Sequence, residues 1–272
     1  MSTTTKQSRV TVRTLHGMKQ QGEKIAMLTA YDASFAAILD EAGVDVVLVG
    51  DSLGNVVQGH DSTVPVTLEH MIYHTQAVAR TCRRPLLMAD MPFMSYWSVE
   101  AALQNAARLL KEAGAQAVKL EWTQAQPEIV AALSREGIPV CAHLGLRPQA
   151  VHKTGGYHVQ GRDKAAAAEL IMQAQQVEAA GADMLLLEAI PAPLAADITA
   201  RMRIPVIGIG AGAACDGQVL VLYDILGISA SPAPRFAKNF LLKAGTVDKA
   251  VKAYVDAVKA GTFPAAEHTY AQ

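Results

Sequence analysis

The sequence lacks the features that mark several classes of protein. Lys and Arg number 24 against 25 for Asp and Glu, so no net field favours nucleic acid or an anionic membrane. The first eight residues, MSTTTKQS, lack the apolar segment of a signal peptide, and no apolar run approaches the ~18 residues of a membrane span. From these absences we expect a soluble, cytoplasmic protein that acts on small molecules.

Cysteine is also scarce. Cys82, Cys141 and Cys215 are widely spaced and form no C-x-x-C pair, which excludes a zinc framework and suits a reducing compartment. We expect all three to be buried as small apolar side chains. Aromatic residues make up 5% of the chain and charged residues 18%, whereas 51% of the 272 residues are hydrophobic, so a large core can form.

A repeated unit runs along the chain. It consists of a helix end, a glycine in the sequence Ala-Gly, an apolar run and a carboxylate. The glycines stand where a helix is commonly terminated by a residue in the left-handed conformation, and the apolar runs indicate buried parallel strands. The unit occurs as EAGVDVVLVGD (41–51), EAGAQAVKLEW (112–122) and EAAGADMLLLEAI (178–190), with Gly43, Gly114 and Gly181.

Five further runs fit the strand half of this unit: 24–32, 84–92, 138–145, 204–212 and 218–227. Eight strands alternating with helices predict an α/β fold, a (β/α)8 barrel, more than a doubly wound sheet. We expect Ser8–Gln20 to form a helix that closes the barrel's bottom and 238–261 to form the last helices. The domain prediction is a flexible N-terminal tail (1–9), one barrel domain (10–262) and a C-terminal tail (263–272).

Four of the predicted strands end in a carboxylate. Asp51, Asp90, Glu121 and Glu188 follow the second, third, fourth and sixth strands. Each alone is explained as a residue that solvates a loop or caps the next helix. Active sites of (β/α)8 barrels occur at these strand ends, however, so four carboxylates together indicate a functional site.

Converging carboxylates repel one another and require a cation. Oxygen ligands favour Mg2+ over zinc, although Mn2+ and Co2+ also accept them. Lys119 precedes Glu121 by two residues, so strand alternation places both on one side of the sheet, which we take as the barrel interior. Ser52 follows Asp51, and His143 stands near the end of the fifth strand; we expect His143 in the pocket without a defined role.

Two glycine-rich pieces leave alternatives open. GIGAG (208–212) is typical of a phosphate cradle, but such glycines also let a loop pass close to the barrel mouth. KTGGYHVQGR (153–162) suits a lid as well as a plain connection.

Several stretches resemble the ketopantoate hydroxymethyltransferase family over about residues 10 to 260. They are MLTAYDASFA (27–36), VGDSLGNVVQGHDSTVPVTLEHM (49–71), ADMPFMSY (89–96), VKLEW (118–122), HLGLRPQ (143–149), GGYHVQGR (155–162), LLLEAIP (185–191) and IGIGAGAACDGQVLVLYDILG (207–227). The resemblance implies a Mg2+-dependent barrel of the phosphoenolpyruvate/pyruvate-utilising type, assembled as a homodecamer. It implies transfer of a one-carbon unit from 5,10-methylenetetrahydrofolate to 3-methyl-2-oxobutanoate through a Mg2+-stabilised enolate, giving 2-dehydropantoate for pantothenate synthesis.

The resemblance also assigns roles to individual residues. Asp51 and Asp90 become metal ligands in contact with the substrate, and Glu121 belongs to the metal's surroundings, through water. Ser52 and Lys119 hold the 2-oxo acid. Glu188 accepts the proton.

Two rival functions stay open at this point. One is another Mg2+-dependent 2-oxo acid lyase or mutase of the same barrel group. The other is a barrel without catalysis, in which the carboxylates only bind a cation.

Overall fold

A closed barrel of eight parallel strands forms the centre of the protein, as seen in a computed structural model that describes residues 8–229 and 232–270. Each strand pairs with the next along the chain, and the eighth pairs with the first. The predicted (β/α)8 barrel is confirmed. The strands are β1 (Ile25–Thr29), β2 (Val46–Val49), β3 (Leu86–Asp90), β4 (Ala117–Glu121), β5 (Val140–Gly145), β6 (Met184–Glu188), β7 (Val206–Ile209) and β8 (Gly217–Leu220).

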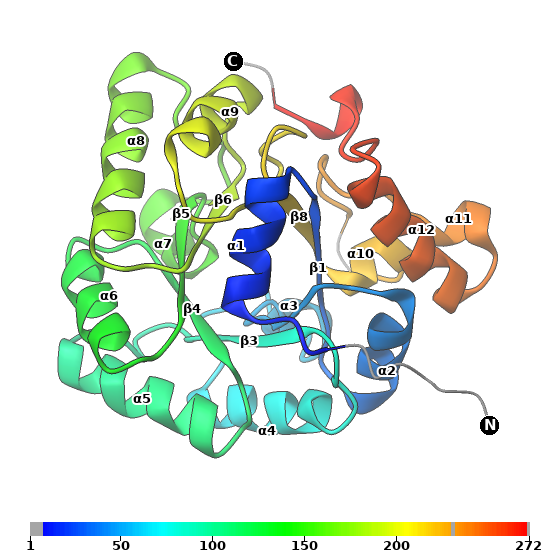
Figure 1. Cartoon of the computed structure of the whole chain (residues 1–272), viewed down its shortest axis with the longest axis horizontal. Helices are drawn as coiled ribbons and strands as arrows, with labels where there is room; N and C mark the ends of the chain where they lie inside the picture. The colour runs from blue at the N-terminus through cyan, green and yellow to red at the C-terminus, as the bar shows by residue number, and fades with distance from the viewer. Residues whose placement is uncertain (1–7, 230–231, 271–272) are drawn as a thin grey trace.

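Helices surround the barrel as an outer ring (Figure 1). Nearly every strand residue is buried, because side chains fill the barrel on one face and the helices cover the other. The α-helices are α1 (Val12–Gln21), α2 (Ala33–Ala42), α3 (Leu53–Val56), α4 (Leu68–Ala79), α5 (Val99–Lys111), α6 (Gln126–Arg135), α7 (Val151–Thr154), α8 (Lys164–Ala179), α9 (Ala192–Arg201), α10 (Leu222–Leu226), α11 (Leu241–Ala244) and α12 (Val247–Lys259). Short 3-10 turns span Pro148–Ala150 and Ala266–His268.

The glycines of the repeat adopt the conformation that the sequence predicts. Gly43, Gly114 and Gly181 all have positive φ, as the repeat predicts for residues that end a helix.

Where the first and last strands meet, the buried Tyr254 of α12 donates its hydroxyl to Met27 O of β1 and Gln218 O of β8, both at 2.9 Å. These two bonds fix α12 across the first and last strands.

Helix α1 crosses one end of the barrel (Figure 1). His16 Nε2 lies 3.0 Å from Asp183 O, just before β6, and Lys19 Nζ lies 2.6 Å from Asp216 Oδ2, just before β8. These contacts are at the N-terminal ends of the strands, so the predicted bottom-closing helix is confirmed. It begins at Val12 and not at Ser8, because Thr11 and Thr14 form a capping box at its N-terminus.

The last two strands depart from the predicted alternation. Residues 210–216, which join β7 to β8, contain no helix. The strand predicted over 218–227 ends at Leu220, and the helix α10 follows from Leu222 to Leu226. Leu222, Ile225 and Leu226 are buried at helical spacing, and Gly227 at φ 66° terminates the turn. The apolar run therefore combines two elements.

The ends of the described chain lie against the barrel. Val10 N donates to Arg84 O at 2.8 Å, while residues 1–7 of the predicted flexible tail lie outside the described residues. Phe263 and His268, in the predicted C-terminal tail, are buried. No helix in the described part of the chain has the length and apolar character to span a membrane.

The three cysteines behave as the composition predicts. All are buried and unpaired with one another.

Candidate active site

The site is built at the C-terminal ends of neighbouring strands. Asp51 follows β2 by two residues, whereas Asp90, Glu121 and Glu188 are the last residues of β3, β4 and β6. Because β2, β3 and β4 are adjacent in the sheet, the first three carboxylates gather at one part of the barrel mouth. The structure brings together residues that the sequence places on separate strands.

Asp90 is the centre of this cluster. Lys119 Nζ lies 2.6 Å from Asp90 Oδ1, and the backbone N–H of Asp51 donates to Asp90 Oδ2 at 3.0 Å. Burial lowers the pKa of Lys119, but the charges of Asp90, Asp51 and Glu121 more than offset it, so this pKa is raised. Lys119 is therefore a permanent ammonium in the pocket.

Gln149, which the sequence analysis did not single out, connects three parts of the site. Its Nε2 donates to Asp51 Oδ2 at 2.8 Å and to Met91 O at 3.0 Å, and its backbone N–H lies 3.2 Å from both carboxylate oxygens of Glu121. The Tyr96 hydroxyl donates to Gln149 Oε1 at 2.5 Å, which fixes the orientation of the amide. Gln149 lies in the quoted stretch HLGLRPQ, but nothing in its spacing indicates these contacts.

The cluster places three carboxyl groups around one ammonium. Asp51, Asp90 and Glu121 are each buried, and Lys119 is the ammonium paired with them. Burial first, and then the charge of Asp90, raises the pKa of Asp51 to about 7. Burial and the charge of Asp51 raise the pKa of Glu121 well above its usual value. A further cation would relieve this repulsion.

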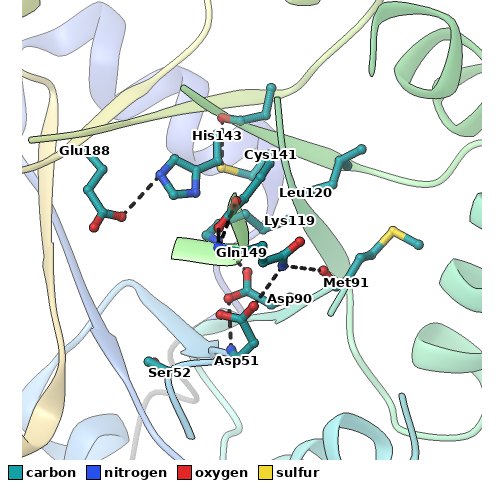
Figure 2. Close-up of polar contacts among 12 residues, drawn as sticks. Asp51, Ser52, Asp90, Met91, Lys119, Leu120, Cys141, His143, Gln149 and Glu188 are labelled. Carbon is teal, nitrogen blue, oxygen red and sulfur yellow. Dashed lines mark hydrogen bonds and ion pairs between the residues drawn. The ribbon is translucent and has the colours of Figure 1, made fainter. Parts of the chain in front are cut away.

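Glu188 and His143 form a separate pair. His143 Nε2 lies 3.2 Å from Glu188 Oε2, and Figure 2 shows the two side chains facing each other apart from Asp51 and Asp90. Within the described residues neither ring nitrogen of His143 has an aligned hydrogen-bond partner. Burial lowers the pKa of His143 well below its usual value, so the ring is neutral, and burial raises the pKa of Glu188 to about 7.

Ser52 stands beside the cluster. Its hydroxyl lies 2.9 Å from the Tyr31 hydroxyl, whose pKa burial raises, so Tyr31 stays protonated. A Cβ at Gly50 would lie 2.8 Å from Ser52 Oγ and 3.5 Å from Asp90 Oδ2. Gly50 therefore keeps the space in front of Asp90 free of a side chain.

The donor set fits a hard divalent cation. Across residues 8–229 and 232–270, no three Asp, Glu, His or Cys side chains form a ready ligand group. Mg2+, however, commonly takes one or two carboxylates and keeps several waters. Asp51 and Asp90 supply two such carboxylates on adjacent strands, and Gly50 leaves space beside them.

Other parts of the protein fill the space beside the glycines of GIGAG. An added Cβ at Gly210 would lie 2.8 Å from Phe236, and one at Gly212 would lie 2.6 Å from Ala192 Cβ. Both have positive φ, so close packing and backbone conformation account for these glycines. This observation favours close passage of the loop over a phosphate cradle.

The 153–162 segment reaches the barrel mouth. Partial burial, followed by the charge of Glu188, raises the pKa of Tyr157 in this segment. Gln160 N also donates to Ala189 O at 2.9 Å. A role as a lid stays a prediction.

Relatives of known name cover almost the whole chain. The family described as Ketopantoate hydroxymethyltransferase matches residues 9–266. Proteins named 3-methyl-2-oxobutanoate hydroxymethyltransferase from Alkalilimnicola ehrlichii and Marinobacter nauticus are each 59% identical over 261 residues. These alignments cover 96% of this chain and 94% and 98% of the two relatives.

Solved structures share the fold at low sequence identity. A putative phosphonomutase from Burkholderia cenocepacia J2315 has a TM-score of 0.61 and 18% identity over 80% of this chain and 95% of its own. A 2,3-dimethylmalate lyase, titled a member of the PEP mutase/isocitrate lyase superfamily, has a TM-score of 0.51 and 16% identity over 72% and 70%. These likenesses concern the fold alone and agree with the (β/α)8 barrel. The match over residues 9–266, with close relatives along the same length, shows that the chain belongs to the ketopantoate hydroxymethyltransferase family.

Proposed function

We propose that this enzyme transfers a hydroxymethyl group from 5,10-methylenetetrahydrofolate to 3-methyl-2-oxobutanoate and forms 2-dehydropantoate. The relatives' printed name supports the acceptor and the group transferred. The observation that carries the proposal is the division of the site into two parts. Three carboxylates are tied to Lys119 and Gln149, whereas Glu188 contacts His143 at a distance from them.

The first part of the site would bind the oxo acid. Ser52 Oγ and Lys119 Nζ are the candidate donors to its oxygens, and Asp51 and Asp90 are the candidate Mg2+ ligands. Glu121, held by the backbone N–H of Gln149, would belong to the metal's surroundings through water. When bound, Mg2+ would supply Lewis-acid stabilisation of negative charge on the keto oxygen. The ammonium of Lys119 would add a second positive group there.

Glu188 would act as the general base. It would take the proton from C3 of the oxo acid, and the electron pair would move toward the keto oxygen. C3 would then bond to the methylene carbon of the donor, the two bonds from that carbon to the folate nitrogens would break, and a water would supply the hydroxyl group, so that tetrahydrofolate is the leaving product. A carboxylate bound to a metal would be a poor base, so the distance of Glu188 from Asp51 and Asp90 suits this role. Its raised pKa, about 7, brings the group close to the range in which bases work at neutral pH.

His143 would hold this base in position. Its neutral ring lies against Glu188 Oε2 and adds no charge that would weaken the base. This role for His143 is our proposal, since the sequence predicts only that it lies in the pocket.

Two reactions test the proposal. The protein with Mg2+ should exchange the C3 proton of 3-methyl-2-oxobutanoate with D2O, and with methylenetetrahydrofolate it should form 2-dehydropantoate. Exchange without transfer, together with cleavage of a larger hydroxy acid, would instead assign it as a lyase or mutase. Absence of exchange would indicate a barrel that only binds a cation.

The assembly, location and metal choice are part of the same proposal. We propose a homodecamer in the cytoplasm that uses Mg2+, on the strength of the family membership. Sedimentation measures the number of subunits in the assembly. Rates of C3 exchange with Mg2+, Mn2+ and Co2+ show which metal supports the reaction best.

A further inference from the structure

A cavity of about 650 Å³ opens beside the candidate active site. We call it the side cavity. Its lining includes residues after β4, residues after β5 and the first turns of α8. The residues on which the argument depends are Trp122, Gly145, Arg147, Lys153 and Gln160.

The side cavity adjoins the strand end that bears Glu188. Gly145 is the Cα partner of Glu188 in the sheet, and the backbone N–H of Gln160 donates to Ala189 O at 2.9 Å. The Glu188 side chain is 14% exposed, against 4% for Asp90 and 7% for Lys119. Glu188 is thus less covered than those two groups. It does not itself line the side cavity, but Gly145, its strand neighbour, does.

The lining suits an aromatic ligand that carries negative charge. Arg147 and Lys153 line the cavity together with one carboxylate, Glu169, so the cations exceed the carboxylate by one. Neither cation forms an ion pair within the part of the chain that the structure describes. Arg147 Nη1 donates to the backbone oxygen of Trp122 at 2.8 Å, and the half-buried Trp122 lines the cavity beside it. Unpaired cations attract carboxylates, and an indole face packs against aromatic rings.

Size favours this cavity over its neighbour. A second cavity, of about 300 Å³, lies at the Glu121 end and is lined by Phe93 and Trp97. It shares Trp122 and Arg147 with the side cavity. Ligand sites commonly measure about 300 to 1,000 Å³, and a folate has a fused ring, a benzoyl ring and a glutamate. Lys153 lines only the larger of the two, which has both the volume and the second cation.

We propose that the side cavity binds the folate one-carbon donor, with an aromatic ring against Trp122 and the glutamate carboxylates toward Arg147 and Lys153. This inference rests on the proposed function, because it assigns the second substrate of the same reaction. The donor then delivers its carbon from the side on which Glu188 takes the proton.

A charge test uses two stable probes, tetrahydrofolate and tetrahydropteroate, which lacks the glutamate. Binding is measured by calorimetry with Mg2+ and the oxo acid present. Lys153→Gln should weaken tetrahydrofolate binding roughly twofold to fivefold and weaken tetrahydropteroate binding less, because the second probe keeps only the carboxylate on its benzoate ring and lacks the two of the glutamate. The matched control is Lys164→Gln, another exposed lysine at the start of α8 that does not line the cavity.

A ring test changes Trp122. Trp122→Leu should weaken both probes about tenfold through lost stacking, and Trp122→Phe should recover most of that loss. Donor binding at wild-type strength in Lys153→Gln and Trp122→Leu would overturn the inference. Failure of the proposed function is seen separately, as absent C3 exchange in the wild-type enzyme, since that reaction needs no folate. Trp122→Phe serves as the deciding variant if Trp122→Leu does not fold.

Discussion

Replacement of Glu188 by Gln tests most directly whether the proposed base is separate from the proposed metal site. The substitution keeps the shape of the side chain but removes its basic atoms. Because Glu188 contacts His143 and not Asp51 or Asp90, we expect Mg2+ and oxo acid affinities to stay near wild type. The rate of C3 exchange should fall about 10²- to 10⁴-fold, the usual contribution of a positioned general base.

The structure also sets the strength of this base. Burial raises the pKa of Glu188 from 4.5 to about 7, against the opposing charge of Lys119. At 1.36 kcal/mol per unit, the buried carboxylate holds a proton about 3 kcal/mol more tightly than an exposed one. The active form is the deprotonated one. Exchange should therefore be fast above pH 7 and fall roughly tenfold per unit as the pH drops below it.

The assay is loss of the C3 proton signal of 3-methyl-2-oxobutanoate in D2O, followed by proton NMR at saturating Mg2+ and oxo acid. Glu136→Gln, an exposed carboxylate after α6, is the matched control and should exchange at the wild-type rate. Retained exchange in Glu188→Gln would falsify the role of this residue as base. A wild-type rate that is flat between about pH 5 and 8 would contradict the raised pKa.

The remaining predictions concern the carboxylates around Lys119 and Gln149, which we propose as the metal site. Asp51→Ala should raise the Mg2+ concentration needed for half-maximal exchange by at least about tenfold, and an unchanged requirement would remove Asp51 from the ligands. Chelation by EDTA should stop exchange and added Mg2+ should restore it, whereas exchange that persists in EDTA would contradict a metal requirement. Gln149→Leu should lower the free energy of unfolding by about 3 to 5 kcal/mol, because it leaves Asp51 Oδ2, Met91 O and the Tyr96 hydroxyl buried without this partner. Tyr96→Phe should cost about 1 to 2 kcal/mol in urea unfolding, and the double variant should lose less than the sum of the two; strict additivity would mean that the contacts are independent.

Local sequence patterns were sufficient for the order of the fold. Apolar runs of strand length, glycines at helix ends and amphipathic helices predict the barrel, because each depends on neighbours a few residues away. Two departures have separate local causes. The run 218–227 is apolar apart from Gln218 and Asp224, so its change from strand to helix at Val221 leaves little mark in hydrophobicity. At the N-terminus, the capping pair Thr11 and Thr14 moves the start of α1.

The residues of the candidate site also fall into those that the local sequence predicts and those that it does not. Carboxylates at strand ends are visible in the sequence, because a charge that ends an apolar run must leave the core. Gln149 is not visible in this way, since it meets Asp51 across 98 residues of sequence. The pairing of His143 with Glu188 likewise depends on β5 lying beside β6.

The sequence by itself determined the repeating unit, its number and the acidic residues at its ends, since hydrophobic periodicity and turn chemistry act over short distances. Only the tertiary structure decided which of these groups share a site, which pKa values rise, and where a cavity opens whose two cations form no ion pair among the described residues. The physical reason is barrel closure: it brings the ends of strands that are far apart in the chain to one mouth, where burial and mutual charge set their chemistry.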